Sequence, residues 1–331
     1  MRKRATLKDV AELSGVSTTT VSHVVNGTRF VDPTTAARVQ SAISELNYVN
    51  NHWAKMLKSD RSNIIGLCIT NYENPYERHI TFYAQKIVQE CGYQLHISVF
   101  QDNMEDNYKS IQNLLSLRVD GVIAPLTPLF LHPQLLNLCE KLGAPIVCAP
   151  ATLEWDFIDT VDTNHEEAAY ETIRLMTQKH RRIGFISGVP EYSTSIDRLN
   201  GYKRALEEAG IPYNEDYVAC GNSSIQGGYE AAKQLLQTDV TAIFAANNSM
   251  MHGTIQAINE TDVSIYDRIA LVGFDDEDWY PLMRPSITAI RQPLEEIIRK
   301  SVELLLDKIE HPDRPSKHIT IPSELIRRES F

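Results

Sequence analysis

The stretch Thr6–Gly27 reads TLKDVAELSGVSTTTVSHVVNG, and its pattern decides the fold of the first part of the chain. Its first four residues, Thr6 to Asp9, form a capping box, so we expect a helix to begin there. Gly15 permits the chain reversal that a tight turn needs, and Ser17 can cap a second helix directly after it. The stretch therefore predicts two short helices joined by a tight turn.

Apolar side chains on these helices predict a small shared core. A cap followed by proline at Asp32-Pro33 adds a third helix that ends near Leu46. The residues expected to face inward are Val10, Ala11, Leu13, Val16, Val21, Val24, Val25, Ala36, Val39, Ile43 and Leu46. Those expected to face outward on the second helix are Thr18, Thr19, Ser22 and His23. This geometry suits a recognition helix in the DNA major groove, but a three-helix protein-docking module fits the same spacing.

The same stretch resembles the head of the LacI/GalR family of bacterial repressors, whose pattern is T-x-x-D-V-A-x-x-A/S-G-V-S-x-x-T-V-S-x-V-x-N. The match runs in register from Thr6 to Asn26 and continues through Asp32-Pro33-Thr34 and Leu46-Asn47-Tyr48. It then extends over the whole remaining chain. The resemblance implies a sequence-specific DNA-binding transcription regulator with double-stranded operator DNA as its partner.

The resemblance also assigns roles within the head. Thr18, Thr19 and His23 would face base edges. The residues that would mainly contact phosphates are Thr6, Ser17, Thr20, Ser22 and Asn26. A histidine can donate to guanine N7 or O6, and a threonine can donate, accept or touch the thymine methyl group, so these residue types suit the task.

The segment Tyr48–Lys58 resembles the hinge helix of the family, which inserts a leucine into the minor groove. Leu57 would be that wedge, and Lys55 and Lys58 would meet phosphates beside it. Two positions depart from the family pattern, because Asn50 stands where a proline is usual and Trp53 replaces a small aliphatic residue. The alternative is an ordinary linker with the leucine packed on the body.

From residue 63 onward, short β-branched runs alternate with helical stretches, which predicts an α/β fold with parallel sheets covered by helices on both faces. The expected strands are Ile64–Thr70, Gln94–Phe100, Gly121–Pro125, Pro145–Cys148, Phe157–Val161, Arg182–Ser187, Ala242–Ala246, Ile269–Phe274 and, near the end, Ile319–Ile321 or Glu324–Arg327. The resemblance implies a periplasmic-binding-protein-like body of two doubly wound lobes. The parts would be a head over 1–48, a hinge over 49–61 and a ligand-binding and dimerisation body over 62–331. The first lobe would comprise about 62–161 and 292–321, and the second about 162–291 and 322–331.

Ligands of doubly wound sheets bind outside the carboxyl ends of the strands, and here two such ends would face each other. The polar residues expected at this cleft are Asn71, Tyr76, Asp162, Asn164, Arg198, Asn247 and Asp275. Arg198 and Asp275 could hold neighbouring hydroxyl groups from two sides. The aromatic candidates for the apolar face of a ligand are Tyr76, Trp155, Tyr192 and Trp279. A small sugar is the expected effector, and a purine-like corepressor is the alternative.

Charge divides the chain unequally. Residues 1–61 hold nine Lys and Arg against five Asp and Glu, a net charge of +4. Since the whole chain has a net charge of −11, residues 62–331 carry −15. A basic head on an acidic body indicates a polyanionic partner for the head alone.

Other function classes find little support in the sequence. Catalytic signatures such as G-x-S-x-G, H-E-x-x-H, Walker and G-x-G-x-x-G motifs are absent, so we expect neither an enzyme nor a cofactor. The five cysteines form no C-x-x-C pair, which favours reduced thiols over a zinc or disulfide site. Without an apolar leader we expect a cytoplasmic protein, and without a leucine-rich heptad tail we expect a homodimer.

Overall fold

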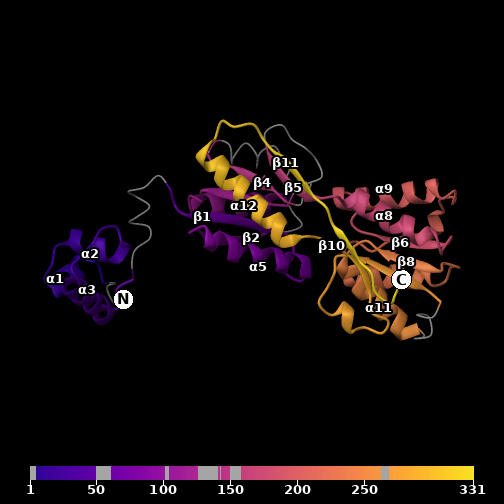
Figure 1. Cartoon of the computed structure of the whole chain (residues 1–331), viewed down its shortest axis with the longest axis horizontal. Helices are drawn as coiled ribbons and strands as arrows, with labels where there is room; N and C mark the ends of the chain where they lie inside the picture. Colours follow the sequence, from indigo (N-terminus) through magenta and orange to yellow (C-terminus); the bar gives the residue numbers. More distant parts are fainter. Residues whose placement is uncertain are drawn as a thin grey trace. The chain divides into compact units, whose positions relative to one another are not determined.

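The computed structural model describes residues 5–49, 61–100, 104–125, 141, 143–149, 158–261 and 268–331. The chain divides into two compact units, Met1–Arg61 and Ser62–Phe331 (Figure 1). We call the first unit the head and the second the body, and each is described by itself.

The head contains three helices, α1 (Leu7–Ser14), α2 (Thr18–Asn26) and α3 (Pro33–Leu46). Each begins at the cap that the sequence predicts. Thr6 and Asp9 form the capping box of α1, while Ser17 accepts from the Thr20 N–H and Asp32 from the Thr35 N–H. Gly15 ends α1 with φ +65°, a left-handed conformation that costs glycine little.

The core of the head is formed by Val10, Ala11, Val21, Val39 and Ala42. One inward prediction is wrong, because Leu13 is 47% exposed. Ser14 takes the buried position and donates its hydroxyl to the Val10 carbonyl at 2.6 Å. With 3.6 residues per turn, Leu13 lies about 100° around the helix from the middle of the buried face.

The first lobe of the body is built on a six-stranded parallel sheet with the order β11-β5-β4-β3-β1-β2. Its strands are β1 (Ile64–Ile69), β2 (Gln94–Val99), β3 (Gly121–Ala124), β4 (Ile146–Cys148), β5 (Asp159–Thr163) and β11 (His318–Ile321). Helices α5 (Pro75–Glu90) and α12 (Leu294–Glu310) cover one face, and α6 (Met104–Ser116) covers the other. Burial of both faces explains why these strands read as continuous apolar runs.

The second lobe has a sheet with the order β12-β10-β9-β8-β6-β7, parallel except for β12 against β10. Its strands are β6 (Ile183–Ser187), β7 (Val218–Cys220), β8 (Ala242–Ala245), β9 (Ala270–Phe274), β10 (Thr288–Arg291) and β12 (Glu324–Ile326). Its helices are α8 (His165–Thr177), α9 (Ser193–Glu208), α10 (Ile225–Leu235) and α11 (Asn248–Thr261), with short 3₁₀ turns η1 (Glu215–Tyr217) and η3 (Tyr280–Leu282). The predicted α/β class with two doubly wound lobes is confirmed.

Four elements differ from the sequence prediction. The strands β7 and β10 are missing from it, and they have only three and four residues. Helix α9 begins at Ser193, which places Arg198 on a helix and not at the end of a strand. Strand β5 extends to Thr163, so Asp162 lies inside the strand rather than after it.

Within the described residues the chain passes three times between the lobes. It does so between β5 and α8, between β10 and α12, and between β11 and β12. Two of these connections are tied together, because the Asn164 side chain accepts from the Ser323 N–H at 2.8 Å and the Thr163 hydroxyl lies 2.5 Å from that of Ser323.

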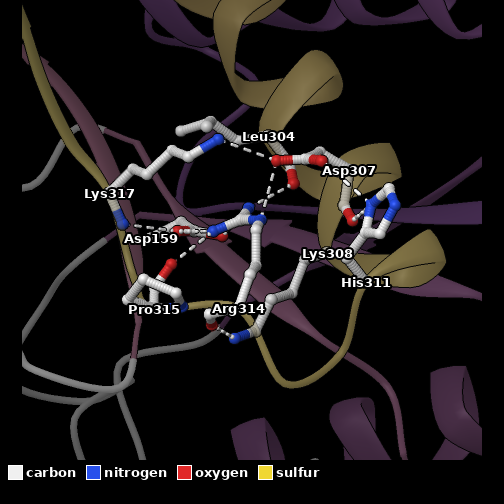
Figure 2. Close-up of polar contacts among 8 residues, drawn as sticks. All are labelled: Asp159, Leu304, Asp307, Lys308, His311, Arg314, Pro315 and Lys317. Carbon is white, nitrogen blue, oxygen red and sulfur yellow. Dashed lines mark hydrogen bonds and ion pairs between the residues drawn. The ribbon is translucent and has the colours of Figure 1, made fainter.

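A buried ion pair holds the loop after α12 against β5 (Figure 2). The Arg314 guanidinium donates to both carboxylate oxygens of Asp159, at 2.8 and 2.6 Å, and to the Leu304 carbonyl at 2.8 Å. Its Nε lies 2.8 Å from the Asp307 carboxylate on α12. The side chains of Asp159 and Arg314 are 1% and 10% exposed, so the pair is a structural clasp rather than a surface salt bridge.

Candidate functional site

The residues predicted to contact DNA lie on and around α2 of the head. Thr18 and Thr19 are exposed, whereas Thr20, Ser22, His23 and Asn26 are half-buried. Thr6 and Ser17 are exposed caps whose side-chain oxygens accept backbone N–H groups of their own helices. Their hydroxyl groups therefore already have a local structural role, and a phosphate contact would come in addition to it.

Two polar side chains on α2 are fixed by neighbours. The Asn26 amide donates to the Ser22 carbonyl at 2.8 Å, which holds it along the helix. The His23 Nδ1 lies 2.9 Å from the Thr28 hydroxyl, so Thr28 orients the imidazole ring. The hinge predictions at Asn50, Trp53, Lys55, Leu57 and Lys58 lie outside the described residues.

The body contains a cleft of about 320 Å³ at the carboxyl ends of strands from both lobes. Of the seven residues predicted to bind a ligand, five line it, and these are Asn71, Tyr76, Arg198, Asn247 and Asp275. Further lining residues include Asn74, Glu77, His165, Tyr192, Ser193, Thr194, Ser195, Asn222, Ser223, Ser224 and Gln292. Most of these side chains are polar, which suits a ligand that carries many hydrogen-bonding groups.

Arg198 projects from α9 and is 7% exposed. Its guanidinium lies 3.6 Å from the centre of the Phe274 ring, donates to the Ala246 carbonyl and lies 3.2 Å from His165 Nδ1. Burial lowers the pKa of this guanidinium and the nearby Asp275 carboxylate raises it. An arginine held in this way is a preorganised donor with a fixed plane.

Asp275 follows β9 with φ +72°, a left-handed conformation that aspartate and asparagine adopt more readily than other side chains. Its carboxylate accepts from the Gln292 amide, which lies where the chain crosses between β10 and α12. Asn247 caps α11, because its Oδ1 accepts from the Met250 N–H at 2.8 Å. The Asn248 amide donates to the Glu277 carboxylate at 2.6 Å, so this amide group is engaged by a neighbouring side chain.

Three buried polar atoms of the cleft residues lack a hydrogen-bond partner among the described residues. They are the Tyr76 hydroxyl, Arg198 Nε and Gln292 Oε1. Burial raises the pKa of the Tyr76 hydroxyl well above its ordinary value, and the Asp162 and Asp275 carboxylates add to the shift, so the phenol stays protonated. Buried polar atoms without partners cost folding free energy, and a polar ligand could satisfy these three.

Asp162 and Asn164 do not line this cleft. Asp162 lies behind His165 and accepts from its Nε2 at 2.9 Å, while His165 Nδ1 accepts from Arg198. Both predicted residues line a different cavity, described below. Of the predicted aromatic platforms, Tyr76 and Tyr192 line the cleft, Trp279 packs edge-on against Tyr280, and Trp155 lies outside the described residues.

Sequence reasoning missed most of the further lining residues, and two groups of them show why. Asn222, Ser223 and Ser224 follow β7, so the prediction of that strand would have pointed to them. His165 and Gln292 lie at the crossings between lobes, and a polar residue beside a crossing is the signal that was available. Both groups were missed for the same reason, because these residues line the cleft only when the carboxyl edges of the two sheets lie on either side of it.

In the described part of the chain no three His, Cys, Asp or Glu residues are grouped so as to hold a metal ion. Of the four described cysteines, Cys68 and Cys148 are buried and Cys91 and Cys220 are exposed. No helix of that part has the length and apolar content needed to cross a membrane.

Known proteins resemble this chain along its whole length. Residues 6–51 match the family of bacterial regulatory proteins, lacI family, and residues 172–331 match the periplasmic binding protein-like domain. The HTH-type transcriptional repressor PurR of Yersinia pestis is 34% identical over 332 residues, which cover 98% of this chain and 96% of that protein. The ribose operon repressor of Escherichia coli is 31% identical over 332 residues, which cover 98% and 99%.

A crystal structure of the Lac repressor bound to ONPG in the repressed state matches with a TM-score of 0.85 and 26% identity, covering 99% of this chain and 100% of that one. The resemblance inferred from Thr6–Gly27 is thus confirmed for head and body together. The chain belongs to the lacI family of bacterial regulatory proteins.

Proposed function

We propose that this transcriptional repressor reads its operator through α2, with Thr18, Thr19 and His23 on base edges. The support is the geometry of the head, where Val21 anchors the inner side of the helix and the threonines are exposed on the outside. The capping hydroxyls of Thr6 and Ser17, with Thr20, Ser22 and Asn26, contact phosphates. The net charge of +4 over residues 1–61 favours DNA at that unit.

The hinge contributes to the same interface. Leu57 enters the minor groove at the operator centre, and Lys55 and Lys58 neutralise phosphates beside it. This part of the proposal rests on the residue types alone.

A small sugar or sugar derivative in the cleft is the effector that we propose. The observation that carries this proposal is the set of three buried atoms without partners, in which Arg198 Nε donates, Gln292 Oε1 accepts and the Tyr76 hydroxyl can do both. A polyhydroxylated ligand offers donors and acceptors on every carbon and can satisfy all three at once. Asp275 and Asn247 then hold its remaining hydroxyl groups, and Tyr76 or Tyr192 covers its C–H face.

A purine corepressor is the second candidate, and the similarity to PurR favours it. A nucleobase presents its hydrogen-bonding groups in one plane and needs an aromatic face above that plane. Tyr76 and Tyr192 supply aromatic rings at the cleft, and Arg198 with Asp275 supplies one donor and one acceptor.

The repressor acts by binding rather than catalysis, in the cytoplasm and as a homodimer on a pseudo-palindromic operator. One neighbouring structure is a Lac repressor dimer bound to operator, which supports the dimeric arrangement. Ligand in the cleft shifts the two lobes and so changes operator affinity, a coupling free energy between two sites. Sugar binding lowers the affinity for the operator, whereas purine binding raises that affinity.

The experiment begins with genomic footprinting, which supplies the operator. Isothermal titration of the full-length chain then compares a panel of pentoses, hexoses and their phosphates with a panel of nucleobases, and fluorescence anisotropy follows operator binding in the presence of each hit. A sugar that binds and weakens operator affinity supports the proposal. A nucleobase that binds and raises operator affinity selects the second candidate. Light scattering that shows a monomer both with and without DNA contradicts the proposed homodimer.

A further inference from the structure

A second cavity lies on the other side of Asp162 and His165 from the cleft. Its volume is about 360 Å³, and we call it the back cavity. The lining residues are Thr160, Asp162, Thr163, Asn164, His165, Glu166, Glu167, Asp197, Arg204, His318, Ile319 and Thr320. Strands β5 and β11 of the first lobe and helices α8 and α9 of the second lobe supply them, and His165 alone of the described lining residues also lines the cleft.

The charges around the back cavity do not balance. Arg204 lies 2.9 Å from Glu166 and 2.5 Å from Glu167, so its single positive charge serves two acids. Asp197 forms no ion pair with a described residue. Burial raises the pKa of the Asp197 carboxyl. Of the charges around it, His165 and Arg198 lower that pKa, and Asp162 and Glu166 raise it.

One atom in this wall lacks a hydrogen-bond partner. Asp162 has a side chain that is 6% exposed, and its Oδ1 accepts from His165 Nε2 at 2.9 Å and from the Thr163 N–H at 2.7 Å. Its Oδ2 is buried and accepts from no described residue. A buried carboxylate oxygen without a donor is costly, and a cationic donor relieves both the missing hydrogen bond and the excess negative charge.

A metal ion does not fit this demand, because no group of three metal-ligating side chains is assembled among the described residues. An ammonium group fits it, since it brings one positive charge and three donors to a single oxygen-rich point. Thr160 and Thr320 belong to the same lining, and the Thr160 hydroxyl lies 2.8 Å from His318 Nδ1.

We propose that the back cavity binds a small organic amine whose ammonium group donates to Asp162 Oδ2, with Asp197 supplying the second negative charge. This site is separate from the cleft, but a chain of contacts joins them. Arg198 donates to His165 Nδ1, and His165 Nε2 donates to Asp162. Because residues of both lobes line the back cavity, the amine stabilises one arrangement of the lobes and couples to the cleft.

The test is isothermal titration of 1,4-diaminobutane into the operator-free full-length protein at about 0.15 M salt, where surface charges are screened beyond roughly 8 Å. The neutral diol of the same length, 1,4-butanediol, is the matched ligand. The diamine is expected to bind one site per chain and the diol is expected not to bind. Binding is measured without operator or cleft ligand, so a failed effector assignment leaves this result unaffected.

Three variants locate the site. Asp162→Asn keeps an acceptor for His165 but replaces the open oxygen, so diamine affinity should fall at least about tenfold, as for loss of a charged hydrogen bond. Asp197→Asn removes only a neighbouring charge and should weaken binding about two- to fivefold. Asp216→Asn removes an exposed carboxylate in η1, away from the cavity, and should leave affinity unchanged.

The melting temperature of each variant shows whether it is folded. If Asp162→Asn does not fold, Asp197→Asn against Asp216→Asn decides the question. Equal affinity in all variants, or no diamine binding at millimolar concentration, overturns the proposal.

Discussion

The guanidinium of Arg198 is held by the Ala246 carbonyl, His165 and the face of Phe274, which leaves Nε open. Each contact comes from a different part of the second lobe, so the orientation of the guanidinium depends on how these parts pack together. A lysine could keep the charge here but would lose the planar fork and the stacking on Phe274. Ligand binding in the cleft therefore depends on a hydrogen-bond donor whose direction is fixed before the ligand arrives.

Asp275 gives a clean test of the cleft. Asp275→Asn removes the charge while keeping a residue type that tolerates φ +72°, so the backbone should not add strain of its own. We expect the effector found by titration to lose its influence on the operator, with operator affinity itself near normal. Anisotropy with and without effector measures both quantities. Asp278→Asn, an exposed residue of the same loop, is the control, and a normal effector response in Asp275→Asn would contradict the site.

His23 should discriminate between operator and random DNA. His23→Ala is expected to cost about 1 to 3 kcal/mol on the cognate operator and little on random sequence. Thr28→Val should produce part of the same loss, because it removes the hydroxyl that lies 2.9 Å from His23 Nδ1. Competition anisotropy with the two DNAs separates the effects. Equal losses on both would remove His23 from base reading.

At the scale of elements, α10 and α11 pack unusually closely because glycines face each other. A Cβ on Gly253 would lie 2.0 Å from the Ile225 carbonyl oxygen and 2.5 Å from the Tyr229 nitrogen, and a Cβ on Gly228 would lie 2.4 Å from the Met250 carbonyl oxygen. These contacts are with backbone atoms, which cannot rotate away. The two helices can therefore approach only while both positions lack side chains.

Gly253→Ala should destabilise the body. Alanine favours a helix over glycine by about 1 kcal/mol, but a backbone clash forces the helices apart at a cost of about 1 to 3 kcal/mol or more, so the clash should win. Gly184→Ala is the comparison, because the nearest atoms to its Cβ would belong to side chains, Leu235 at 3.1 Å and Ile243 at 3.4 Å, and side chains can move. Thermal unfolding compares the two. A melting temperature of Gly253→Ala at or above the parent value would show that the helix pair separates freely.

At the scale of the whole molecule, the clasp between Arg314 and Asp159 joins the loop before β11 to the start of β5, at the end of these strands opposite to the crossings between lobes. The Lys317 N–H also donates to Asp159 at 2.8 Å, and its Nζ lies 2.9 Å from Asp307 (Figure 2). The segment between α12 and β11 is thus held by charges rather than by apolar packing. Loss of these ionic contacts should therefore lower the stability of the body.

Arg314→Ala should lower the free energy of unfolding by about 3 to 5 kcal/mol, because it leaves Asp159 charged and buried without its partner. Lys317→Ala should cost less than about 1 kcal/mol, since that side chain is 53% exposed. Denaturant unfolding followed by circular dichroism measures both. The double variant with Asp159→Asn should recover part of the loss, and a single variant as stable as the parent would show that the clasp contributes little.

Sequence alone determined the head and the class of the body. Caps at Thr6, Ser17 and Asp32 act within three residues of themselves, and a strand buried on both faces is a continuous apolar run, so both leave local signals. Where local signals were weak the prediction failed, as at Leu13, at β7 and β10, and at the end of β5.

Only the tertiary structure decided which polar residues share a cleft. Asn71, Arg198, Asn247 and Asp275 meet because parallel strands present their carboxyl ends at one edge, and that general rule was available from the sequence. The place of Asp162 behind His165 was not available from the sequence, because it depends on two extra strand residues and on how the two lobes pack around their crossings. Local sequence sets where elements begin and end, whereas contacts between distant residues are fixed by the packing of whole sheets.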